Sequence, residues 1–280
     1  MKPVFSVLTL LFISLSNPSW GKTLTWDDLV LRNHLYYEKF TNVPFTGEIT
    51  GLRRGKIKNG KLSGEWLYFY KNGQLEMKGA FKDGKYYGFW EFFYENGQLK
   101  EKQSYKDGKL DSLYEEFYDD GQLKAKGNYK DGRRDGHWEY YHELGELEHK
   151  GNYKDGKEDG LWESFCENGQ LWGKATYKDG KQEGHFENFY CNGQLEMRGY
   201  AKDGKLEGLF ESFHDNGQLW EKINYKDGEL DGLYEEFYYD GPLKVKGNYK
   251  DEKPEGLFEY FNEDGTLAKT ETYKDGELVE

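Results

Sequence analysis

The strongest constraint on the fold of this chain is a motif that recurs every 24 residues. One copy is Glu95–Leu99 (sequence ENGQL), preceded by the aromatic run 88–94. A fixed period in the range of roughly 20 to 50 residues indicates an array of similar units, each of which contacts mainly its neighbours. The turn glycine of the motif occurs nine times without an insertion, at Gly73, Gly97, Gly121, Gly145, Gly169, Gly193, Gly217, Gly241 and Gly265.

Composition supports an ordered array and argues against several kinds of partner. Hydrophobic residues make up only 36% of the 280 residues, but aromatic residues make up 18%. Aromatic side chains give the chain enough area to bury, so it is not expected to be disordered, and its core cannot be mainly aliphatic. A net charge of -13 argues against binding to nucleic acid and against simple electrostatic docking on anionic lipid.

Two turn signals alternate along the array. One contains Asn96 and Gly97, and the other is a Lys-Asp-Gly sequence that ends at Gly108 and its equivalents. Such pairs between aromatic runs favour a type I′ turn, in which both central residues have positive φ. Two two-residue turns and two strands of ten residues would account for the period. Leu144 replaces Asn at one turn and Glu252 replaces Gly at another, which predicts other loop types there.

Counting outward from Asn96 and Gly97 predicts how the two strands of a hairpin pair. The position of Glu91 is acidic in eight of nine repeats and the position of Lys102 is basic in eight. Each hairpin is therefore expected to carry a cross-strand ion pair worth roughly 0.2–1 kcal/mol, which sets the register more than the stability. The predicted pairs are Tyr94 with Leu99, Glu91 with Lys102, Trp90 with Gln103 and Gly88 with Tyr105.

The other face of each hairpin is expected to hold the packing. The position of Trp90 is aromatic in all nine repeats, and its cross-strand partner is mostly glycine. The position of Tyr105 likewise faces a second series of glycines, represented by Gly88. An aromatic ring over a cross-strand glycine covers bare backbone and offsets the poor strand propensity of glycine. We therefore assign structural roles to Trp90, Glu91, Asn96, Gly97, Lys102 and Tyr105.

The period fits either a parallel solenoid or an antiparallel meander. A solenoid would stack equal positions ~4.8 Å apart and place eight glutamates in one ladder, whereas a meander alternates glutamate with lysine. Directly opposed like charges are destabilising. We therefore predict an all-β fold, an elongated single twisted antiparallel sheet of tandem 24-residue hairpins.

The chain divides into three predicted segments. Residues 1–21 have a positive start, an apolar stretch at 4–15 and small residues before Lys22, as is typical of a cleaved signal peptide. A membrane anchor would need ~20 apolar residues, so we expect an exported protein without a transmembrane segment in the mature chain. Residues 22–54 are expected to form an N-terminal cap with degenerate strands, in which Thr25 and Asp28 cap a short helix through Leu31. Residues 55–280 form the array.

The repeated motif, Gly-x-Trp-x-x-Phe-Tyr-x-Asn-Gly-Gln-Leu-x-x-Lys-Gly-x-Tyr-Lys-Asp-Gly-Lys-x-x-Gly, resembles the MORN repeat variant over residues 55–280. Chains built from it are similar to the family labelled YwqK-type antitoxins of toxin–antitoxin systems. The resemblance implies a sheet of hairpins used as a scaffold or binding surface, and the antitoxin label implies neutralisation of a toxin by direct binding. It offers no catalytic residues.

Two exposed tryptophans are the candidate contact residues. Trp172 and Trp220 occupy a position that is otherwise Lys, Glu or Ala, and we expect them on the charged face. Wide apolar side chains among solvated ones favour a partner-binding role. The alternative is that they only cover the neighbouring Phe165 and Phe213.

Cys166 and Cys191 are the two cysteines of the chain. An even pair in an exported protein favours a disulfide. The meander, however, would hold them roughly 10 Å apart, beyond the ~7 Å limit between Cα atoms. Geometry thus argues against the bond, and its presence would favour the solenoid.

No constellation of catalytic residues occurs in the sequence, and the six histidines fall at positions that a meander keeps apart. We expect no enzyme activity, no cofactor and no metal site. The first functional hypothesis is an exported scaffold that binds a protein partner, with antitoxin-like neutralisation as one form of it. The alternative is a cell-wall, glycan or choline-binding repeat protein that uses aromatic platforms.

Overall fold

The computed structural model describes residues 21–279, so the predicted signal peptide lies outside the described residues except for Gly21. The chain divides into two compact units, Met1–Lys85 and Tyr86–Glu280. Among residues 21–279 the single helical element is one 3₁₀ turn, and none of the helical structure described there is long and apolar enough to cross a membrane. The predicted all-β class is confirmed.

The first unit contains the N-terminal segment and the beginning of the array. Thr25 and Asp28 form the predicted capping interaction, but the helix ends at Asp28 and the chain continues as a strand rather than as helix through Leu31. Residues 29–32 pair instead with residues 35–38, and such pairing overrides the helix propensity of the two leucines. The elements are β1 Thr23–Thr25, the 3₁₀ helix Trp26–Asp28, β2 Leu29–Arg32, β3 Leu35–Glu38, β4 Gly47–Thr50, β5 Arg53–Lys58, β6 Lys61–Phe69 and β7 Leu75–Lys82.

Strand β1 pairs in parallel with β4, whereas β4 to β7 pair antiparallel in chain order. Strands β2 and β3 form a separate two-stranded sheet. The predicted degenerate strands of residues 22–54 are therefore present. The apolar side chains Leu24, Phe45 and Ile49 of this segment are buried. Trp26 contacts Trp66 of β6, so the segment shares its core with the start of the array.

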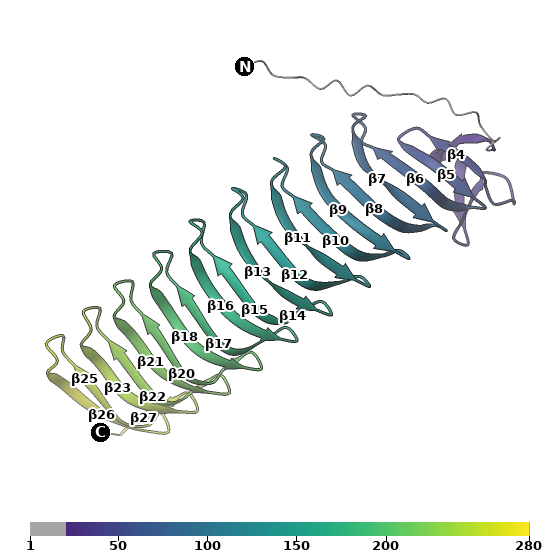
Figure 1. The fold of residues 1–280 in the computed structure, drawn as a ribbon. Helices are drawn as coiled ribbons and strands as arrows, with labels where there is room; N and C mark the ends of the chain where they lie inside the picture. Colours follow the sequence, from purple (N-terminus) through teal and green to yellow (C-terminus); the bar gives the residue numbers. More distant parts are fainter. Residues whose placement is uncertain (1–20, 280) are drawn as a thin grey trace, which may run out of the picture. The chain divides into compact units, whose positions relative to one another are not determined.

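The second unit is a single layer of antiparallel strands in which each strand lies beside its neighbours in the chain (Figure 1). This arrangement confirms the meander and excludes the solenoid, because equal positions lie two strands apart. The strands are β8 Lys85–Phe93, β9 Leu99–Lys106, β10 Lys109–Phe117, β11 Leu123–Lys130, β12 Arg133–Tyr141, β13 Leu147–Lys154, β14 Lys157–Glu158, β15 Gly160–Phe165, β16 Leu171–Lys178, β17 Lys181–Phe189, β18 Leu195–Lys202, β19 Lys205–Leu206, β20 Gly208–Phe213, β21 Leu219–Lys226, β22 Glu229–Phe237, β23 Leu243–Lys250, β24 Lys253–Pro254, β25 Gly256–Phe261, β26 Leu267–Lys274 and β27 Glu277–Leu278.

The two turns of a repeat differ, which was not predicted. Asp107 and Gly108 have φ of 52° and 84°, so the Lys-Asp-Gly turn is the predicted type I′ turn. At the other turn Gly97 has φ 88°, whereas Asn96 does not have positive φ and accepts a 2.9 Å hydrogen bond from the Gln98 amide. The type I′ prediction was therefore wrong for Asn96 and Gly97, where the asparagine closes its own backbone in an Asx turn.

The Asn-Gly loop spans residues 94–98, between β8 and β9. Tyr94 N–H donates to the Gln98 carbonyl over 2.8 Å, and Gly97 N–H donates to the Tyr94 carbonyl over 2.9 Å. The loops that contain Leu144 and Pro242 make the same pair of backbone bonds, and Asp251 and Glu252 both have positive φ. The prediction of other loop types at Leu144 and Glu252 was therefore wrong, because the backbone bonds of each turn hold its conformation without the usual side chain.

Most of the predicted register is confirmed. Glu91 lies opposite Lys102, Trp90 opposite Gln103 and Gly88 opposite Tyr105. A bulge then places Phe93, rather than Tyr94, opposite Leu99, because the loop is longer than two residues and uses Tyr94 as its first member.

Candidate binding surface

Alternation along the strands gives the second unit two faces. We call the face that carries Trp90 and its equivalents the aromatic face, and the face that carries Glu91, Lys102 and their equivalents the ladder face. Trp90 is 0% exposed and Trp138 is 1% exposed, so in a one-layer sheet the aromatic face holds the packing core.

Trp138 and Trp162 each cover a glycine, but not the one predicted from their own hairpins. A Cβ at Gly127 would overlap the ring of Trp138, and one at Gly151 would overlap the ring of Trp162. Trp138 Nε1 also donates to the Asn128 carbonyl over 3.1 Å. The ring therefore leans onto the preceding hairpin, and these contacts join one repeat to the next.

Glycine is required in the second series for a different reason from the predicted one. Gly88 and Gly136 lie opposite Tyr105 and Tyr153 as expected, but a Cβ on either would meet no atom within 4 Å. Both have positive φ, 68° and 71°, and the strand pairing is irregular beside the equivalent position in β10. Glycine is used here because a bulge needs a left-handed backbone.

Ser112 is the exception in this series and gives a direct test of that explanation. It occupies the position of Gly88 and Gly136 with φ 76°. Replacing Ser112 with Gly is expected to stabilise the protein by about 1–2 kcal/mol, the usual cost of a left-handed conformation for a residue with a Cβ. Chemical denaturation measures the change. Gly136→Ser is the matched control and should destabilise by a similar amount; if both substitutions are neutral, the explanation is wrong.

Tyr105, to which the sequence assigned a structural role, is half-buried on the aromatic face. Its ring stacks on Tyr86 with centroids 4.9 Å apart, and its hydroxyl donates to Gln103 Oε1 over 2.5 Å. Burial raises the pKa of Tyr105 to about 12. The residue therefore stays neutral and serves packing.

The ladder face carries alternating acids and bases, as predicted. Lys102 lies opposite Glu91 on one side and opposite Glu115 on the other. Lys126 Nζ lies 2.5 Å from Glu139 Oε2 in the next hairpin. Burial opposes ionisation of Glu139, but the bonds from Lys126 and Tyr141 lower its pKa to about 2. Other contacts between a base and the next hairpin are Lys102–Glu115, Lys150–Glu163, Lys174–Glu187 and Arg198–Glu211.

These pairs change the predicted role of the ladder. Each hairpin was expected to hold its own ion pair, and Lys246 with Glu235 is such a case at 3.7 Å. The five pairs above instead link consecutive hairpins. The charges therefore fix how one repeat pairs with the next, which the sequence alone did not distinguish because each strand has two neighbours.

The Asn-Gly loops also contact one another in series. Tyr94 Oη donates to the Phe117 carbonyl over 2.8 Å, and Asn96 Nδ2 donates to the Asp119 carbonyl over 2.8 Å. Equivalent bonds start at Tyr118, Tyr190 and Tyr238. Asn96 thus has the predicted structural role, but it joins two repeats as well as shaping its own turn.

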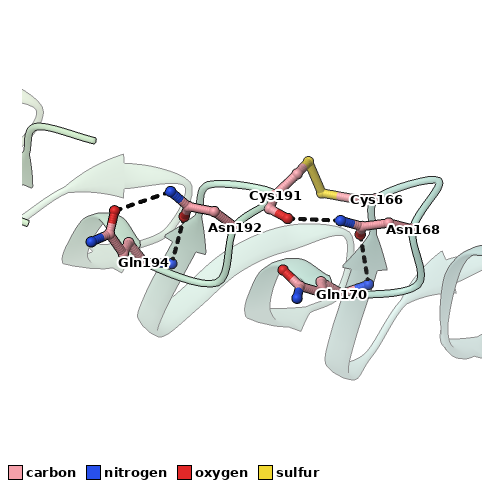
Figure 2. Close-up of a disulfide and its surroundings, with 6 residues drawn as sticks. All are labelled: Cys166, Asn168, Gln170, Cys191, Asn192 and Gln194. Atoms are coloured by element: carbon pink, nitrogen blue, oxygen red, sulfur yellow. Dashed lines mark hydrogen bonds between the residues drawn. A yellow bond between two sulfur atoms is a disulfide. The ribbon is translucent and has the colours of Figure 1, made fainter. Parts of the chain in front are cut away.

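Cys166 occupies the position of Tyr94 in this series and is bonded to Cys191 in the next loop (Figure 2). Their Cα atoms are 5.9 Å apart, within the range for a disulfide. Asn168 Nδ2 donates to the Cys191 carbonyl over 2.8 Å beside the bond. The expectation against a disulfide was wrong, and so was the inference that one would indicate a solenoid. Strands β15 and β17 lie two strand spacings apart, but the loops that follow them bend toward one another and bring the two cysteines together.

The structure places Trp172 and Trp220 at a bulge next to the Asn-Gly loop, 47% and 43% exposed. Trp220 stacks on His214, which in turn contacts Tyr239 in the next loop. Trp220 therefore covers a loop histidine, not Phe213. Lys100 and Lys124 occupy the position of Trp220 in other repeats. Their ammonium groups lie over the rings of Tyr94 and Tyr118, which occupy the position of His214.

Trp172 instead lines a hollow on the aromatic face, so the prediction that it lies on the charged face was wrong. The hollow has a volume of about 270 Å³ and lies over β15, β16 and β17. Gly173 and Ala175 of the central strand form its floor, with Ser164 and Asn188 opposite Gly173 on either side. The bulge explains the error, since it turns the residue after Leu171 away from the simple alternation of a strand.

With this geometry established, comparison with known sequences decides the family. The MORN repeat variant model matches eight segments that together cover more than half of the chain. The chain belongs to the MORN repeat variant family. The matched segments are 62–83, 87–107, 110–131, 134–155, 158–179, 206–227, 230–251 and 254–275.

Residues 182–203 lie between two matched MORN segments and fold in the same way. They form the β17–β18 hairpin, with Glu187 opposite Arg198 and the usual bulge before Phe189. The structure therefore supports the ninth repeat counted from the sequence.

No curated protein matches the chain. Two similar solved structures are a complex titled TcdB2-TccC3-Cdc42, at 13% identity and TM-score 0.20, and one titled TcdB2-TccC3, at 12% identity and TM-score 0.18. The matches cover 78% and 81% of this chain but only 14% and 13% of those chains. Similarity at this level carries no argument about fold or function.

The MORN repeats show no metal centre in the part of the chain that the structure describes, since no group of three or more His, Cys, Asp or Glu side chains there is arranged to hold an ion. Sequence reasoning missed the residues that form the hollow, namely Ser164, Gly173 and Asn188. A comparison of side-chain size by repeat position would have found them, because Tyr140 and His149 occupy the equivalent positions one repeat earlier.

Proposed function

We propose that this chain is a non-enzymatic, exported scaffold that holds a protein partner on the ladder face of its second unit. One observation carries the proposal. Large apolar side chains stand exposed at one repeat position of that face, beside the ion pairs. They are Phe89 at 61%, Leu161 at 50%, Leu209 at 43% and Leu257 at 52% exposure.

These four side chains lie two or three repeats apart in one column, and the positions between them hold Leu113, His137, His185 and Leu233. Apolar side chains aligned along one face with a polar rim favour a protein interface. Here the rim is the alternating Glu and Lys ladder, which can orient a partner by charge complementarity. Because the column extends across several hairpins, a partner would bind along the sheet rather than in one pocket, as in other repeat proteins.

Export is part of the proposal and rests on two features. The sequence of residues 1–21 has the pattern of a cleaved signal peptide, and the bond between Cys166 and Cys191 is typical of an oxidising compartment. Neutralisation of a toxin would be one form of this function, with the toxin as the partner on the ladder face. In an exported chain that role would be exercised outside the cytoplasm.

The test uses residues 22–280 as bait against the cell envelope and medium of the source cell. A matched variant carries Leu161→Lys, Leu209→Lys and Leu257→Lys, which leave the backbone and the aromatic face unchanged. We expect a saturable protein partner that the wild type retains and this variant loses. Trp172→Ala, on the other face, should retain the partner. If the triple variant and the wild type retain the same proteins equally well, the ladder face is not the interface.

A further inference from the structure

The hollow on the aromatic face exists because three neighbouring positions are small. One repeat earlier, Tyr140 and His149 fill the equivalent place and stack with ring centroids 4.2 Å apart. At the hollow these positions are Ser164 and Gly173, and the same position as Ser164 in the following hairpin is Asn188. The space is therefore built by side-chain choice, not by an irregular backbone.

The walls of the hollow combine aromatic rings with neutral polar groups. Trp162, Trp172, Tyr177 and Phe186 supply the rings, and Ser164, Gln182 and Asn188 supply a hydroxyl and two amides. Within the described part of the chain, these three side chains make no hydrogen bond to another group. They can therefore donate to a ligand and accept from it.

The charges around the hollow narrow the chemistry of its ligand. Its lining contains no carboxylate and one base, Lys174, which pairs with Glu187 at 2.8 Å. Aromatic rings by themselves also attract a quaternary ammonium ion, so choline has to be tested beside the sugars. Burial raises the pKa of Tyr177, with a further contribution from Glu158, so its hydroxyl also remains neutral.

The disulfide holds the two outer strands of this site in place. Cys166 directly follows β15, which carries Trp162 and Ser164, and Cys191 lies two residues after β17, which carries Phe186 and Asn188. The bond therefore lies at the edge of the sheet where β16, the central strand of the hollow, begins at Leu171. Fixing the walls before a ligand arrives lowers the entropy lost on binding. The only two cysteines of the chain lie at the one place where three strands form this hollow.

We propose that the hollow over β15, β16 and β17 binds a single pyranose ring of a neutral glycan. A pyranose presents C–H groups on one face, which pack on aromatic rings, and hydroxyls around its edge, which bond to amides and hydroxyls. The open volume of about 270 Å³ lies just below the usual range of small-ligand pockets, roughly 300–1,000 Å³, and so suits one ring of a longer chain. This site is on the opposite face from the proposed protein interface and does not depend on it.

The experiment titrates oxidised residues 22–280 with three tetrasaccharides, made of β-1,4-linked glucose, β-1,4-linked N-acetylglucosamine or α-1,4-linked glucose, and follows tryptophan fluorescence and saturation-transfer NMR. Glucose and N-acetylglucosamine test whether a free sugar suffices. Choline and N-acetyl-tyrosine amide test the other chemistries that aromatic rings accept. We expect one tetrasaccharide to bind saturably and more tightly than its monosaccharide.

Two variants locate the site. Gly173→Met should fill the hollow and still fold, because Met197 occupies the same position in the next repeat. Trp172→Ala should remove one wall. Each should weaken binding by about tenfold or more, as expected for the loss of an aromatic contact, whereas Trp220→Ala should bind like the wild type.

Three results would overturn the proposal: no saturable binding of any tetrasaccharide, equal binding by Gly173→Met, or binding of choline or the tyrosine amide that no saccharide displaces. The Leu161, Leu209 and Leu257 variant should bind the tetrasaccharide normally. Failure here and failure of the protein-partner proposal are therefore distinguishable.

Discussion

Replacing Trp138 with Ala is expected to destabilise its region by about 3–5 kcal/mol, the usual cost of truncating a buried tryptophan. The side chain is 1% exposed and contacts Tyr114, Tyr129 and Tyr153 on three strands around it. Its ring also covers Gly127. Since the sheet has one layer, no second layer can move in to fill the cavity.

The effect should be local, because each repeat of an array contacts mainly its neighbours. Hydrogen exchange should show lost protection in β11–β13 and little change in β21–β23. Trp138→Phe is the milder comparison: Phe186, Phe210 and Phe258 occupy the same position, so the loss should be mainly the bond to the Asn128 carbonyl, about 1 kcal/mol. Trp172→Ala is the exposed control. Equal destabilisation by Trp138→Ala and Trp172→Ala would refute the account of the core.

Removing the disulfide with Cys166→Ala and Cys191→Ala is expected to destabilise the β15–β18 region by roughly 3–4 kcal/mol, the chain-entropy value for a loop of this length. The bond joins residues 25 positions apart. The change is expected in loops 166–170 and 190–194, because the bond connects these two loops directly. Urea unfolding and hydrogen exchange under oxidising conditions measure it.

A second variant separates the loss of the bond from the loss of contact between loops. Cys166→Tyr with Cys191→Glu restores residue types found at these two positions in other repeats, as in Tyr94 and Glu95. The new tyrosine should donate to a carbonyl of the following hairpin, as Tyr190 donates to Phe213 over 2.8 Å. We expect this variant to regain about 1 kcal/mol relative to the alanine pair. Equal stability of the two variants would contradict the proposed equivalence of the disulfide and the tyrosine bond.

The sequence was most informative where repetition multiplied a weak local signal. A single Glu91–Lys102 pair would not fix a register, but the same acid and base recurring in eight repeats did. The choice of a meander followed from charge, since a solenoid would have stacked the glutamates. Trp90 and Gly97 were likewise identified because their residue types recur at one position.

The same reasoning failed where a position has two neighbours or leaves the plane of the sheet. Counting from the turn considers one hairpin at a time. It therefore assigned the tryptophan rings and most of the ion pairs to the partner strand of the same hairpin, whereas they contact the neighbouring hairpin. It also treated Cys166 and Cys191 as points in a flat lattice, whereas their loops lean together and bring the Cα atoms to 5.9 Å. The bulge at Trp172 likewise places this candidate residue on the aromatic face instead of the ladder face, because a bulge interrupts the alternation of side chains along a strand.

By itself, the sequence determined the all-β class, the 24-residue period, most of the strand pairing within each hairpin and the presence of an aromatic and a charged face. These properties depend on local turn chemistry and on alternation along a strand, which repeat in every copy. Only the tertiary structure decided which contacts join successive repeats, that the two cysteines are bonded, and that Ser164, Gly173 and Asn188 leave a hollow beside Trp172. Each of these features depends on residues from several strands and loops at once. The distances between those residues follow from the conformations of the loops and bulges, which the repeat pattern does not specify.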